Sequence, residues 1–384
     1  MNSIYKIGII GGGASGLFCA ILLKQFNPSL NVTIYEGQNK IGKKILQTGN
    51  GKCNLCNINL SGNNYNTNKV QELIDSFSAL DLINIFNSWG LMTRVDEEGR
   101  VYPYSEKATT VLDILLKKIE ELSINVNTSC YISKIEYKDK YLLYSNDNKK
   151  YDCDYIIMST GGSSSINYNN NGYKLLESLG HTKKDIFPSL CALKTKENTK
   201  HLSGIRVKCK ASIIIDNEVK HETRGEILFK DDGLSGIAIF ILSQFYQKNK
   251  KCYVSLDLYE EKTIDELNNE LYKKSNLEDS LMGYFPKMIN LDLIKKCNNN
   301  IGKLIKDYRF EIIDTYSFNN SQVTKGGICL DEVDFNNFAS LKANNLYITG
   351  EVLDVDGTCG GYNLYFAFAS AYKVALDLNK KIGE

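Results

Sequence analysis

The stretch Lys6-Ile7-Gly8-Ile9-Ile10-Gly11-Gly12-Gly13-Ala14-Ser15-Gly16 decides the fold. It opens with a short apolar run that is typical of a buried strand and continues at once into a glycine turn. The spacing Gly11-x-Gly13-x-x-Gly16 permits a tight turn, close approach of the backbone to a pyrophosphate, and packing of a helix on the strand. The apolar segment after the turn stops at Asn27-Pro28. We therefore predict a strand, a turn and a helix whose N-terminus faces phosphates, with a turn that binds no ligand as the competing interpretation.

An acidic residue follows the next predicted strand. The β-branched run Asn31 to Tyr35 ends at Glu36, which completes a strand-helix-strand unit of about 30 residues. A carboxylate at this distance from the glycine turn hydrogen-bonds the ribose of a dinucleotide. Because a carboxylate suits a free 2′-hydroxyl and repels a 2′-phosphate, Glu36 favours FAD or NAD over NADP.

A second element of glycines and acids lies near the C-terminus. The predicted strand 346–350 leads into Gly350 to Gly357, and Gly360-Gly361-Tyr362-Asn363 then begins a helix that we expect to reach Asn379. The positive end of that helix can stabilise negative charge on a reduced flavin ring. NAD does not require a second glycine-rich binding element, so the two elements together favour FAD. A tight loop before an ordinary core helix is the competing interpretation.

A third element, Gly42 to Asn54, combines glycines, lysines and a cysteine in one loop. Such a loop suits close approach to a cofactor and to an anionic partner. Cys53-x-x-Cys56 is either a redox dithiol or one functional cysteine with an incidental neighbour. No second cysteine pair completes a zinc site, and we expect the three histidines, His181, His201 and His221, at the surface. We therefore expect no metal.

The overall composition shows no excess of charge. Forty-six Lys and Arg against 45 Asp and Glu give a formal net charge of +1, so a nucleic-acid or membrane partner has to be sought locally. The apolar run 237–242 is much shorter than the roughly 18 residues of a membrane helix. Met1 leads directly into the first strand without a secretory leader, and 11 irregularly spaced cysteines are typical of reduced thiols. We expect a cytoplasmic protein without a membrane partner.

The length of 384 residues exceeds what one hydrophobic core supports and predicts two or three domains. Helical periodicity at 70–89 and 109–122 and a small β-meander at 125–154 precede a β-rich stretch and then a Leu- and Lys-rich stretch. We expect the first part of a dinucleotide-binding domain, a β-rich insert on the substrate side, a helical segment and the second part of the first domain. These parts span residues 1–187, 188–262, 263–322 and 323–384.

Several motifs together resemble the BaiN/RdsA (YhiN-like) family of FAD-dependent oxidoreductases, in the family's order and over essentially the whole chain. They are Gly11 to Gly16, Thr48-Gly49-x-Gly51-Lys52-Cys53-Asn54-Leu55, Thr160-Gly161-Gly162, Val323-Thr324-Lys325-Gly326-Gly327 and Gly350-Glu351-Val352-Leu353-Asp354 with Gly360-Gly361-Tyr362-Asn363. The chain departs from the family at Lys230-Asp231, where the family tends to carry Thr-His, and at Cys56, where it usually carries Thr. The first departure bears on the substrate, and the second favours Cys53 alone as the functional cysteine.

The resemblance implies an α/β fold with a Rossmann-like, glutathione-reductase-type FAD-binding domain, interrupted by a β-barrel-like insert and a small helical segment. It implies reduction of a carbon–carbon double bond, with one branch of the family acting on uridine in 23S rRNA and another named for bile acid metabolism. Because only one Gly-x-Gly-x-x-Gly is complete, we expect NAD(P)H to dock transiently as the electron donor.

The motifs and the resemblance also assign roles to single residues. The residues expected to bind FAD are Gly11, Gly13, Ala14, Ser15, Gly16, Glu36, Lys44, Thr48, Gly49, Gly51, Cys53, Asn54, Thr160, Gly161, Gly350, Glu351, Asp354, Gly360, Gly361, Tyr362 and Asn363. Cys53 is the expected proton donor, with Tyr362 as the alternative.

A basic stretch in the insert bears on the partner. It holds six cations against Glu197 alone, namely Lys194, Lys196, Lys200, Arg206, Lys208 and Lys210. Such a stretch suits the phosphates of rRNA, and a solvated edge of the insert explains it equally well. Two other functions remain open: reduction of a small, bile-acid-like enone, and a flavin-bound RNA-binding or assembly protein. The sequence shows no coiled-coil pattern, so it predicts no particular oligomeric state.

Overall fold

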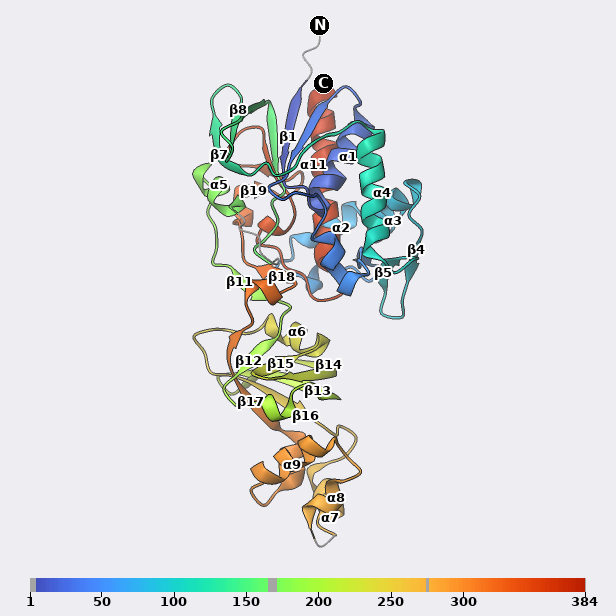
Figure 1. Ribbon diagram of the computed structural model, residues 1–384, viewed down its shortest axis with the longest axis vertical. Coiled ribbons are helices and arrows are strands. Elements are labelled where there is room, and N and C mark those ends of the chain that lie inside the picture. The colour runs from blue at the N-terminus through green and yellow to red at the C-terminus, as the bar shows by residue number, and fades with distance from the viewer. Residues whose placement is uncertain (1–4, 165–170, 274–275, 384) are drawn as a thin grey trace. The chain divides into compact units, whose positions relative to one another are not determined.

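The computed structural model describes residues 5–164, 171–273 and 276–383. The chain divides into two compact units, of which the first comprises residues 1–187 and 323–384 and the second residues 188–322 (Figure 1). Within the described ranges, no helix combines the length and the apolar character that a membrane span requires.

The first unit is built on a seven-stranded sheet with the order β19-β20-β21-β10-β1-β2-β6. Five neighbouring strands, from β21 to β6, are parallel, and two short antiparallel strands extend the sheet at one edge. The strands are β1 (Lys6–Ile10), β2 (Asn31–Tyr35), β6 (Asn125–Asn127), β10 (Tyr155–Met158), β19 (Val333–Asp334), β20 (Ala339–Ser340) and β21 (Leu346–Ile348). The near-continuous apolar character of β1 and β10 is what a strand covered on both faces requires.

The register of the parallel strands aligns their carboxyl ends. Ile10 of β1 lies opposite Tyr35 of β2 and Met158 of β10, and Met158 lies opposite Ile348 of β21. The residues that follow these four strands therefore emerge together at one edge of the sheet. In open α/β sheets this edge is where ligands bind.

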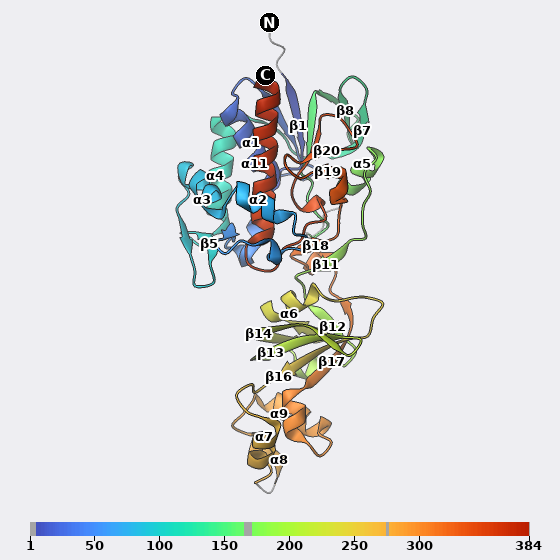
Figure 2. The same ribbon diagram turned by 180° about the vertical axis from the view of Figure 1, so that it is seen from behind.

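Helices cover one face of the sheet. The long helices of this layer are α1 (Ala14–Phe26), α4 (Ala108–Glu121) and α11 (Tyr362–Gly383), and the shorter ones are α2 (Val70–Ser76) and α3 (Ala79–Ser88). Helix α5 (Gly172–Ser178) lies apart from them, against β7 (Ile132–Tyr137). Helices α1 and α11 lie side by side in both views (Figures 1 and 2). The rings of Phe18 and Phe368 join them with centroids 5.0 Å apart, and Phe86 of α3 lies 5.1 Å from Phe368. This aromatic contact fixes the two helices whose N-termini border the ligand edge.

The helical periodicity at 70–89 corresponds to two helices rather than one. The first ends at Ser76, and Ser78 begins the second, because its hydroxyl accepts a hydrogen bond from the Asp81 amide at 3.2 Å while the Asp81 carboxylate accepts one from the Ser78 amide at 2.7 Å. This reciprocal capping box has a sequence signature, Ser-x-x-Asp, that periodicity alone overlooks.

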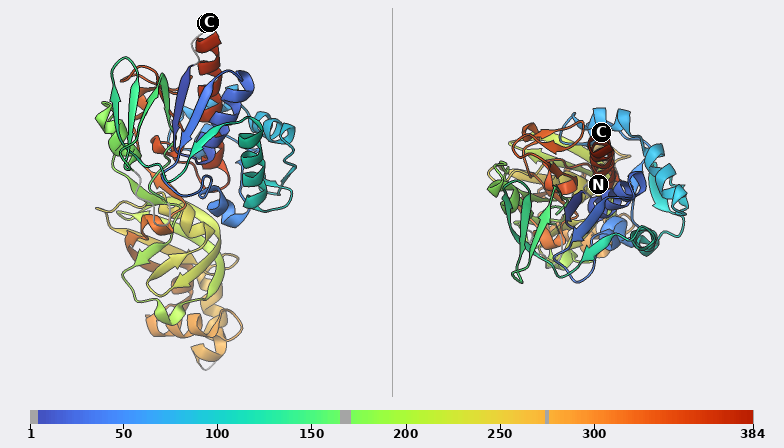
Figure 3. Two further views of the ribbon diagram at one scale, coloured as in Figure 1. Left: turned by 45° about the horizontal axis from the view of Figure 1, so that its top comes forward. Right: turned by 90° about the horizontal axis from the view of Figure 1, so that it is seen from above.

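A β-meander covers the opposite face of the sheet (Figure 3). It comprises β7 (Ile132–Tyr137), β8 (Tyr141–Ser145) and β9 (Lys150–Cys153). A β-carbon at Gly8 would lie 2.6 Å from the Cys153 sulfur, so glycine permits this close packing. The meander expected at 125–154 is therefore present, except that residues 125–127 form β6 and belong to the main sheet.

A small antiparallel sheet completes the first unit. Its strands are β3 (Cys56–Asn57), β5 (Arg100–Pro103) and β4 (Thr93–Val95), in the order β3-β5-β4. It connects the cysteine loop, through the pairing of Cys56 with Val101, to the surface around Tyr102 and Arg94. Two further short strands, β11 (Phe187–Ser189) and β18 (Val323–Lys325), lie where the chain leaves and re-enters this unit in sequence.

The second unit is a closed barrel with a helical segment. The barrel order is β12-β15-β14-β13-β16-β17, formed by β12 (Leu193–Thr195), β13 (Arg206–Ile215), β14 (Glu218–Lys230), β15 (Gly233–Ser235), β16 (Cys252–Asp257) and β17 (Tyr308–Thr315). Its helices are α6 (Ile237–Ser243), α7 (Ile264–Leu271), α8 (Leu277–Leu281), α9 (Lys287–Lys296) and α10 (Ile301–Lys306). The expected fold class, a Rossmann-like domain with a barrel-like insert, is confirmed.

One expectation about the insert is wrong in detail. Residues 308–315 fall in the predicted helical segment 263–322, yet they form β17, which closes the barrel against β12 and β16. Tyr308, Phe310 and Ile312 alternate with more exposed residues and point into the barrel core. This period of two, rather than the preceding helical composition, decides the structure of the segment.

The contact between α1 and α11 can be tested by a large-to-small substitution. Phe368→Ala removes a ring with 0% exposure and is expected to lower the free energy of unfolding by about 3–5 kcal/mol. Leu376→Ala, on the same helix but 46% exposed, serves as the control and is expected to cost less than about 1 kcal/mol. Urea unfolding followed by circular dichroism measures both, and equal losses would contradict this packing.

Candidate functional site

The glycine turn after β1 lies at the ligand edge of the sheet. A β-carbon at Gly11 would lie 2.3 Å from the Ser159 carbonyl oxygen, and Gly11 has φ = 110°. A β-carbon at Gly16 would lie 2.0 Å from the Gly11 carbonyl oxygen. Both glycines are therefore required by the packing of the turn against β10 and of α1 against the turn.

Gly13 differs from its two neighbours in the motif. Its φ of −85° is open to any residue, and a β-carbon there would meet no protein atom within 4 Å. No side chain caps the N-terminus of α1, where the first amides have no intrahelical acceptor. No contact within the described part of the chain requires glycine at this position, so the open space before α1 fits a diphosphate.

Glu36 lies beside the glycine turn, as its spacing in the sequence predicts. Its buried carboxylate accepts hydrogen bonds from the Gly12 amide and from the Gln38 amide, each at 2.8 Å. These bonds hold the carboxylate beside the glycine turn, and each oxygen keeps acceptor capacity for a ribose hydroxyl. The residue thus fits the role predicted from its spacing.

Glu351 joins three segments at the centre of the site. One carboxylate oxygen accepts from Lys44 at 2.5 Å and from the Gly162 amide at 3.1 Å, and the other accepts from the Thr324 amide at 2.9 Å. Thr324 in turn accepts from the amides of Ser163 and Ser164. The predicted residues Lys44 and Glu351 are therefore brought together, with Glu351 clamping the loops 42–54 and 160–164.

Gly350 connects the two glycine-rich elements. It has φ = 73°, and a β-carbon there would lie 2.9 Å from the hydroxyl oxygen of Ser15 in the first turn of α1. The Gly350 amide donates to Ser370 of α11 at 3.1 Å. The start of α1 and the Gly350 turn therefore meet, as two halves of one ligand cradle must.

The cysteine loop approaches the turn before α11. A β-carbon at Gly361 would lie 2.5 Å from the Cys56 carbonyl oxygen and 2.7 Å from Asn54 Oδ1, and one at Gly49 would lie 2.8 Å from the Asn54 amide. Asn54 Oδ1 is buried without a hydrogen-bond partner among the described residues. A buried polar atom in this state is expected to have an unseen partner, which a bound cofactor would supply.

Side chains that sequence reasoning missed support the same turn. Asn57 donates to the Gly360 carbonyl at 3.2 Å, and the Tyr65 hydroxyl donates to the Tyr362 carbonyl at 2.9 Å. Neither residue stands in a pattern that marks it in the sequence. Their contacts arise from chain segments about 300 positions apart, which only the folded chain brings together.

Two of the predicted cofactor residues use their polar atoms within the protein. Asn363 closes the turn before α11, because its side chain accepts from the Gly357 amide and donates to the Gly357 carbonyl, both at 2.8 Å. Asp354 accepts from Lys184 at 2.7 Å and from Asn66 at 3.2 Å. Both residues therefore shape the cradle, and their direct contact with FAD stays a prediction.

Cys53 and Tyr362, the two predicted proton donors, differ in their surroundings. Cys53 has 0% exposure and φ = 57°, and burial raises the pKa of its thiol to about 12, with the Thr48 hydroxyl acting in the opposite direction. Burial likewise raises the pKa of Cys56 to about 12. Tyr362 is 8% exposed, and burial raises its pKa as well. All three groups are protonated at neutral pH, which disfavours a thiolate-based dithiol.

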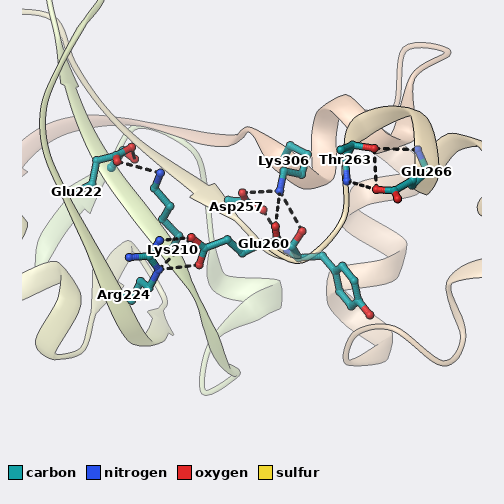
Figure 4. A network of polar contacts seen from close by, with 10 residues as sticks. Lys210, Glu222, Arg224, Asp257, Glu260, Thr263, Glu266 and Lys306 are labelled. Carbon is teal, nitrogen blue, oxygen red and sulfur yellow. Dashed lines mark hydrogen bonds and ion pairs between the residues drawn. The ribbon is translucent and has the colours of Figure 1, made fainter.

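Acidic neighbours pair several cations of the predicted basic stretch. Lys196 contacts Glu311 at 3.0 Å, Lys210 contacts Glu222 at 2.9 Å, and Arg206 contacts Glu226. Figure 4 shows Lys210 with Glu222, beside the pairs of Arg224 with Glu260 and of Lys306 with Asp257. The strands β14, β16 and β17 supply most of these acids, so the local charge excess read from 194–210 is reduced by residues distant in sequence.

The histidines do not all lie at the surface as expected. His181 is only 4% exposed; its Nε2 lies 2.8 Å from the Ser340 hydroxyl and its Nδ1 lies 3.4 Å from Glu332. Burial lowers the pKa of His181, and Glu332 acts in the opposite direction. The prediction was wrong because a residue in a polar stretch of sequence can still be covered in the fold, here by Ser340 of β20. Among the described residues, no group of three or more His, Cys, Asp or Glu is placed to hold a metal.

The contrast between Gly13 and Gly16 yields a paired test. Gly13→Ala places a methyl group in open space, so stability is expected to change by less than about 1 kcal/mol while FAD affinity falls about tenfold or more. Gly16→Ala drives a methyl group into the Gly11 carbonyl and is expected to lower the melting temperature as well. Thermal unfolding of the apoprotein and fluorescence titration with FAD separate the two effects. Unchanged flavin affinity in Gly13→Ala would contradict the assigned diphosphate position.

The chain is similar over nearly its whole length to a protein family and to several of its relatives. A family model described as the HI0933-like protein Rossmann domain matches residues 5–377. A 3-dehydro-bile acid delta(4,6)-reductase from Clostridium scindens is 31% identical, over 96% of this chain and 97% of the relative. A ribosomal RNA dihydrouridine synthase from Haemophilus influenzae is 27% identical, over 97% of this chain and 98% of the relative.

Solved structures share the fold. The 3-ketosteroid-delta4-(5alpha)-dehydrogenase from Rhodococcus jostii RHA1 has a TM-score of 0.51 at 12% identity, and the match covers 98% of this chain and 97% of the dehydrogenase chain. The open conformation of a flavocytochrome c3 fumarate reductase has a TM-score of 0.50 at 12% identity, and the match covers 100% of this chain and 79% of the reductase chain. At this identity the likeness concerns the fold alone.

The glycine turn, the Glu36 carboxylate and the second glycine-rich element meet at one edge of the sheet, an arrangement that fits FAD. Together with the family match over residues 5–377 and the relative at 31% identity, they show that the chain belongs to the HI0933-like family of FAD-dependent oxidoreductases.

Proposed function

We propose that this enzyme reduces an activated carbon–carbon double bond with electrons from NAD(P)H, and that its substrate is a uridine of 23S rRNA. The observation that carries the redox proposal is the open space beside Gly13 at the uncapped N-terminus of α1, next to Gly12, whose amide donates to Glu36. The names of both relatives describe reduction of a ring double bond next to a conjugated carbonyl or its equivalent, since dihydrouridine is uridine saturated at C5 and C6. An rRNA substrate also goes with the cytoplasmic location expected from the sequence.

A small enone is the second candidate substrate. The relative at 31% identity is named for a bile acid, whereas the dihydrouridine synthase is 27% identical. The pairing of Lys196, Arg206 and Lys210 with acids weakens the case for the basic stretch as an RNA surface. A flavin-bound RNA-binding or assembly protein, as a third possibility, would need no electron donor.

The residues of the site have separate tasks in this proposal. When bound, FAD supplies hydride exchange with the donor and with the substrate. Glu36 and the amides at the start of α1 hold the adenosine and diphosphate half, while Glu351 keeps loop 42–54 closed against Gly162. Hydride addition to one carbon of the double bond leaves negative charge on the other, so a proton has to be delivered there.

Tyr362 is better placed than Cys53 to deliver that proton. A side chain that lines a flavin cavity should be reachable by solvent when no cofactor is bound, and the Cys53 thiol has 0% exposure. Tyr362, at the N-terminus of α11, is 8% exposed, and its phenol, whose pKa burial raises above the ordinary value, carries its proton at neutral pH. We therefore propose Tyr362 as the proton donor and a packing role for Cys53.

Reduction by the donor is the first test of this function. Anaerobic stopped-flow mixing of the FAD-loaded protein with NADH or NADPH is expected to bleach the flavin absorbance near 450 nm, because hydride enters the bound flavin. If both donors leave the flavin oxidised, the reductase proposal fails as stated. Measuring dihydrouridine in 23S rRNA from a deletion strain and its parent then tests the substrate: a lower content supports rRNA, and an unchanged content removes it.

Substitutions separate the two candidate proton donors. Tyr362→Phe is expected to lower kcat about 100-fold or more, while reduction of the flavin by NAD(P)H keeps its rate, since only the second half-reaction needs the proton. Cys53→Ala is expected to change kcat less than about threefold and to lower the melting temperature, as Cys56→Ala, the matched control, also does. A large loss of kcat in Cys53→Ala alone would reverse the assignment.

A further inference from the structure

A polar cleft opens in the first unit beside the cysteine loop. Its volume is about 480 Å³, which lies within the range of small-molecule sites. Its walls come from three segments: Asn50 to Lys52 at the end of the loop, Arg94 of β4, and Tyr104 to Lys107 after β5. The FAD motifs account for none of Arg94, Tyr104 and Lys107.

The charges around this cleft are unbalanced. Lys52, Arg94 and Lys107 supply three cations, and Glu106 supplies the carboxylate among the lining residues. Lys52 lies 2.6 Å from one oxygen of Glu106, and Arg94 contacts the other. One carboxylate thus bridges two cations in the cleft, the position that an incoming phosphate would take or share.

An aromatic ring forms part of the same wall. Tyr104 is 68% exposed, and the Arg94 guanidinium lies 5.9 Å from the centre of its ring. An exposed aromatic ring and an arginine guanidinium are both groups that stack on nucleobases. The cleft therefore offers phosphate contacts and a stacking surface next to each other.

The backbone at Glu106 is held in an uncommon conformation. Its φ of 50° lies in the left-handed region that non-glycine residues rarely adopt, and its amide donates to the Pro103 carbonyl at 2.8 Å. The tight turn places the carboxylate between Lys52 and Arg94 at a cost in local strain. Strain of this kind is concentrated at ligand sites.

Hydrogen bonds connect the cleft to the candidate active site. The Leu55 amide donates to the Val101 carbonyl at 2.8 Å, and Arg94 pairs with Tyr102 across β4 and β5. Lys52, in the cleft wall, directly precedes Cys53. A ligand in the cleft therefore lies against the same loop that packs on the turn before Tyr362.

We infer that this cleft binds one phosphate-bearing nucleotide, with its phosphate on Lys52, Arg94 and Lys107 and its base against Tyr104. The inference rests on the proposed function, because a reductase with an RNA substrate or a dinucleotide donor has to hold such a group near the flavin. The nucleotide belongs either to the RNA that carries the target uridine or to the NAD(P)H donor. A small enone has no phosphate and does not use the cleft.

Binding to the oxidised, FAD-loaded protein tests the inference without turnover. The probes are a fluorescein-labelled uridine octanucleotide, followed by anisotropy, and NAD⁺ and NADP⁺, followed by flavin fluorescence. Arg94→Gln and Lys107→Gln are expected to weaken binding of one probe class about tenfold, since each removes a charge-assisted contact. Glu106→Gln is expected to tighten it, because the competing carboxylate charge is removed. Lys117→Gln, on α4 and 70% exposed, is the control and is expected to have no effect.

The pattern of effects assigns the source of the nucleotide. The cleft is assigned to RNA if the substitutions change the affinity for the octanucleotide alone. In that case the slope of log binding constant against log salt concentration is expected to fall by about one for each cation removed. Changes confined to NAD⁺ or NADP⁺ assign it to the donor. The inference is wrong if no probe class binds more weakly to Arg94→Gln and more tightly to Glu106→Gln than to the unchanged protein.

Separate measurements distinguish a loss of folding or of flavin reduction from a loss of probe binding. Flavin absorbance and melting temperature report whether each variant is intact, and Lys107→Gln, at an exposed position, keeps the test valid if Arg94→Gln unfolds. Should NAD(P)H fail to reduce the flavin while the binding pattern holds, the reductase proposal falls and the nucleotide cleft stands. The reverse result removes the cleft and leaves the reductase.

Discussion

The parallel register around β1 is the constraint on which the site depends. Because Ile10, Tyr35, Met158 and Ile348 align across neighbouring strands, the chain emerges from four strands at one edge. This edge receives the Gly11 turn, Glu36, Ser159 and Gly350, which are separated by up to 339 positions in sequence. A shift of one residue in any pairing would send alternate side chains to the wrong face and separate these groups.

Close backbone contacts convert that edge into a cradle. The β-carbon positions of Gly11, Gly16, Gly350 and Gly361 would all collide with backbone or with short side chains. Glu351 then joins three loops through charge-assisted hydrogen bonds in a partly buried setting, where such bonds are shorter and stronger than neutral ones. Of the three glycines in Gly11-x-Gly13-x-x-Gly16, Gly13 is the one that faces open space among the described residues, and this difference distinguishes a structural glycine from one whose absent side chain leaves room for a ligand.

Much of the fold and of the adenosine half of the site could be predicted from local patterns. The strand, turn and helix at 6–26 and the acid at Glu36 depend on contacts within 31 residues, which periodicity and spacing report directly. Strand β17 carries a period of two in its sequence, but it directly follows a helical stretch, and only its pairing with β12 and β16 separates it from that stretch. The support from Asn57 and Tyr65, the burial of His181 and the neutralised cations of the insert share this origin in long-range contacts.

The central claim is that the space before Gly13 and the carboxylate of Glu36 receive the adenosine diphosphate half of FAD. A crystal structure of the protein with bound FAD measures this directly. The account predicts diphosphate oxygens about 3 Å from amides in the first turn of α1, and a ribose hydroxyl at a similar distance from Glu36. A diphosphate bound elsewhere, with the space before Gly13 filled by protein or water, would contradict it.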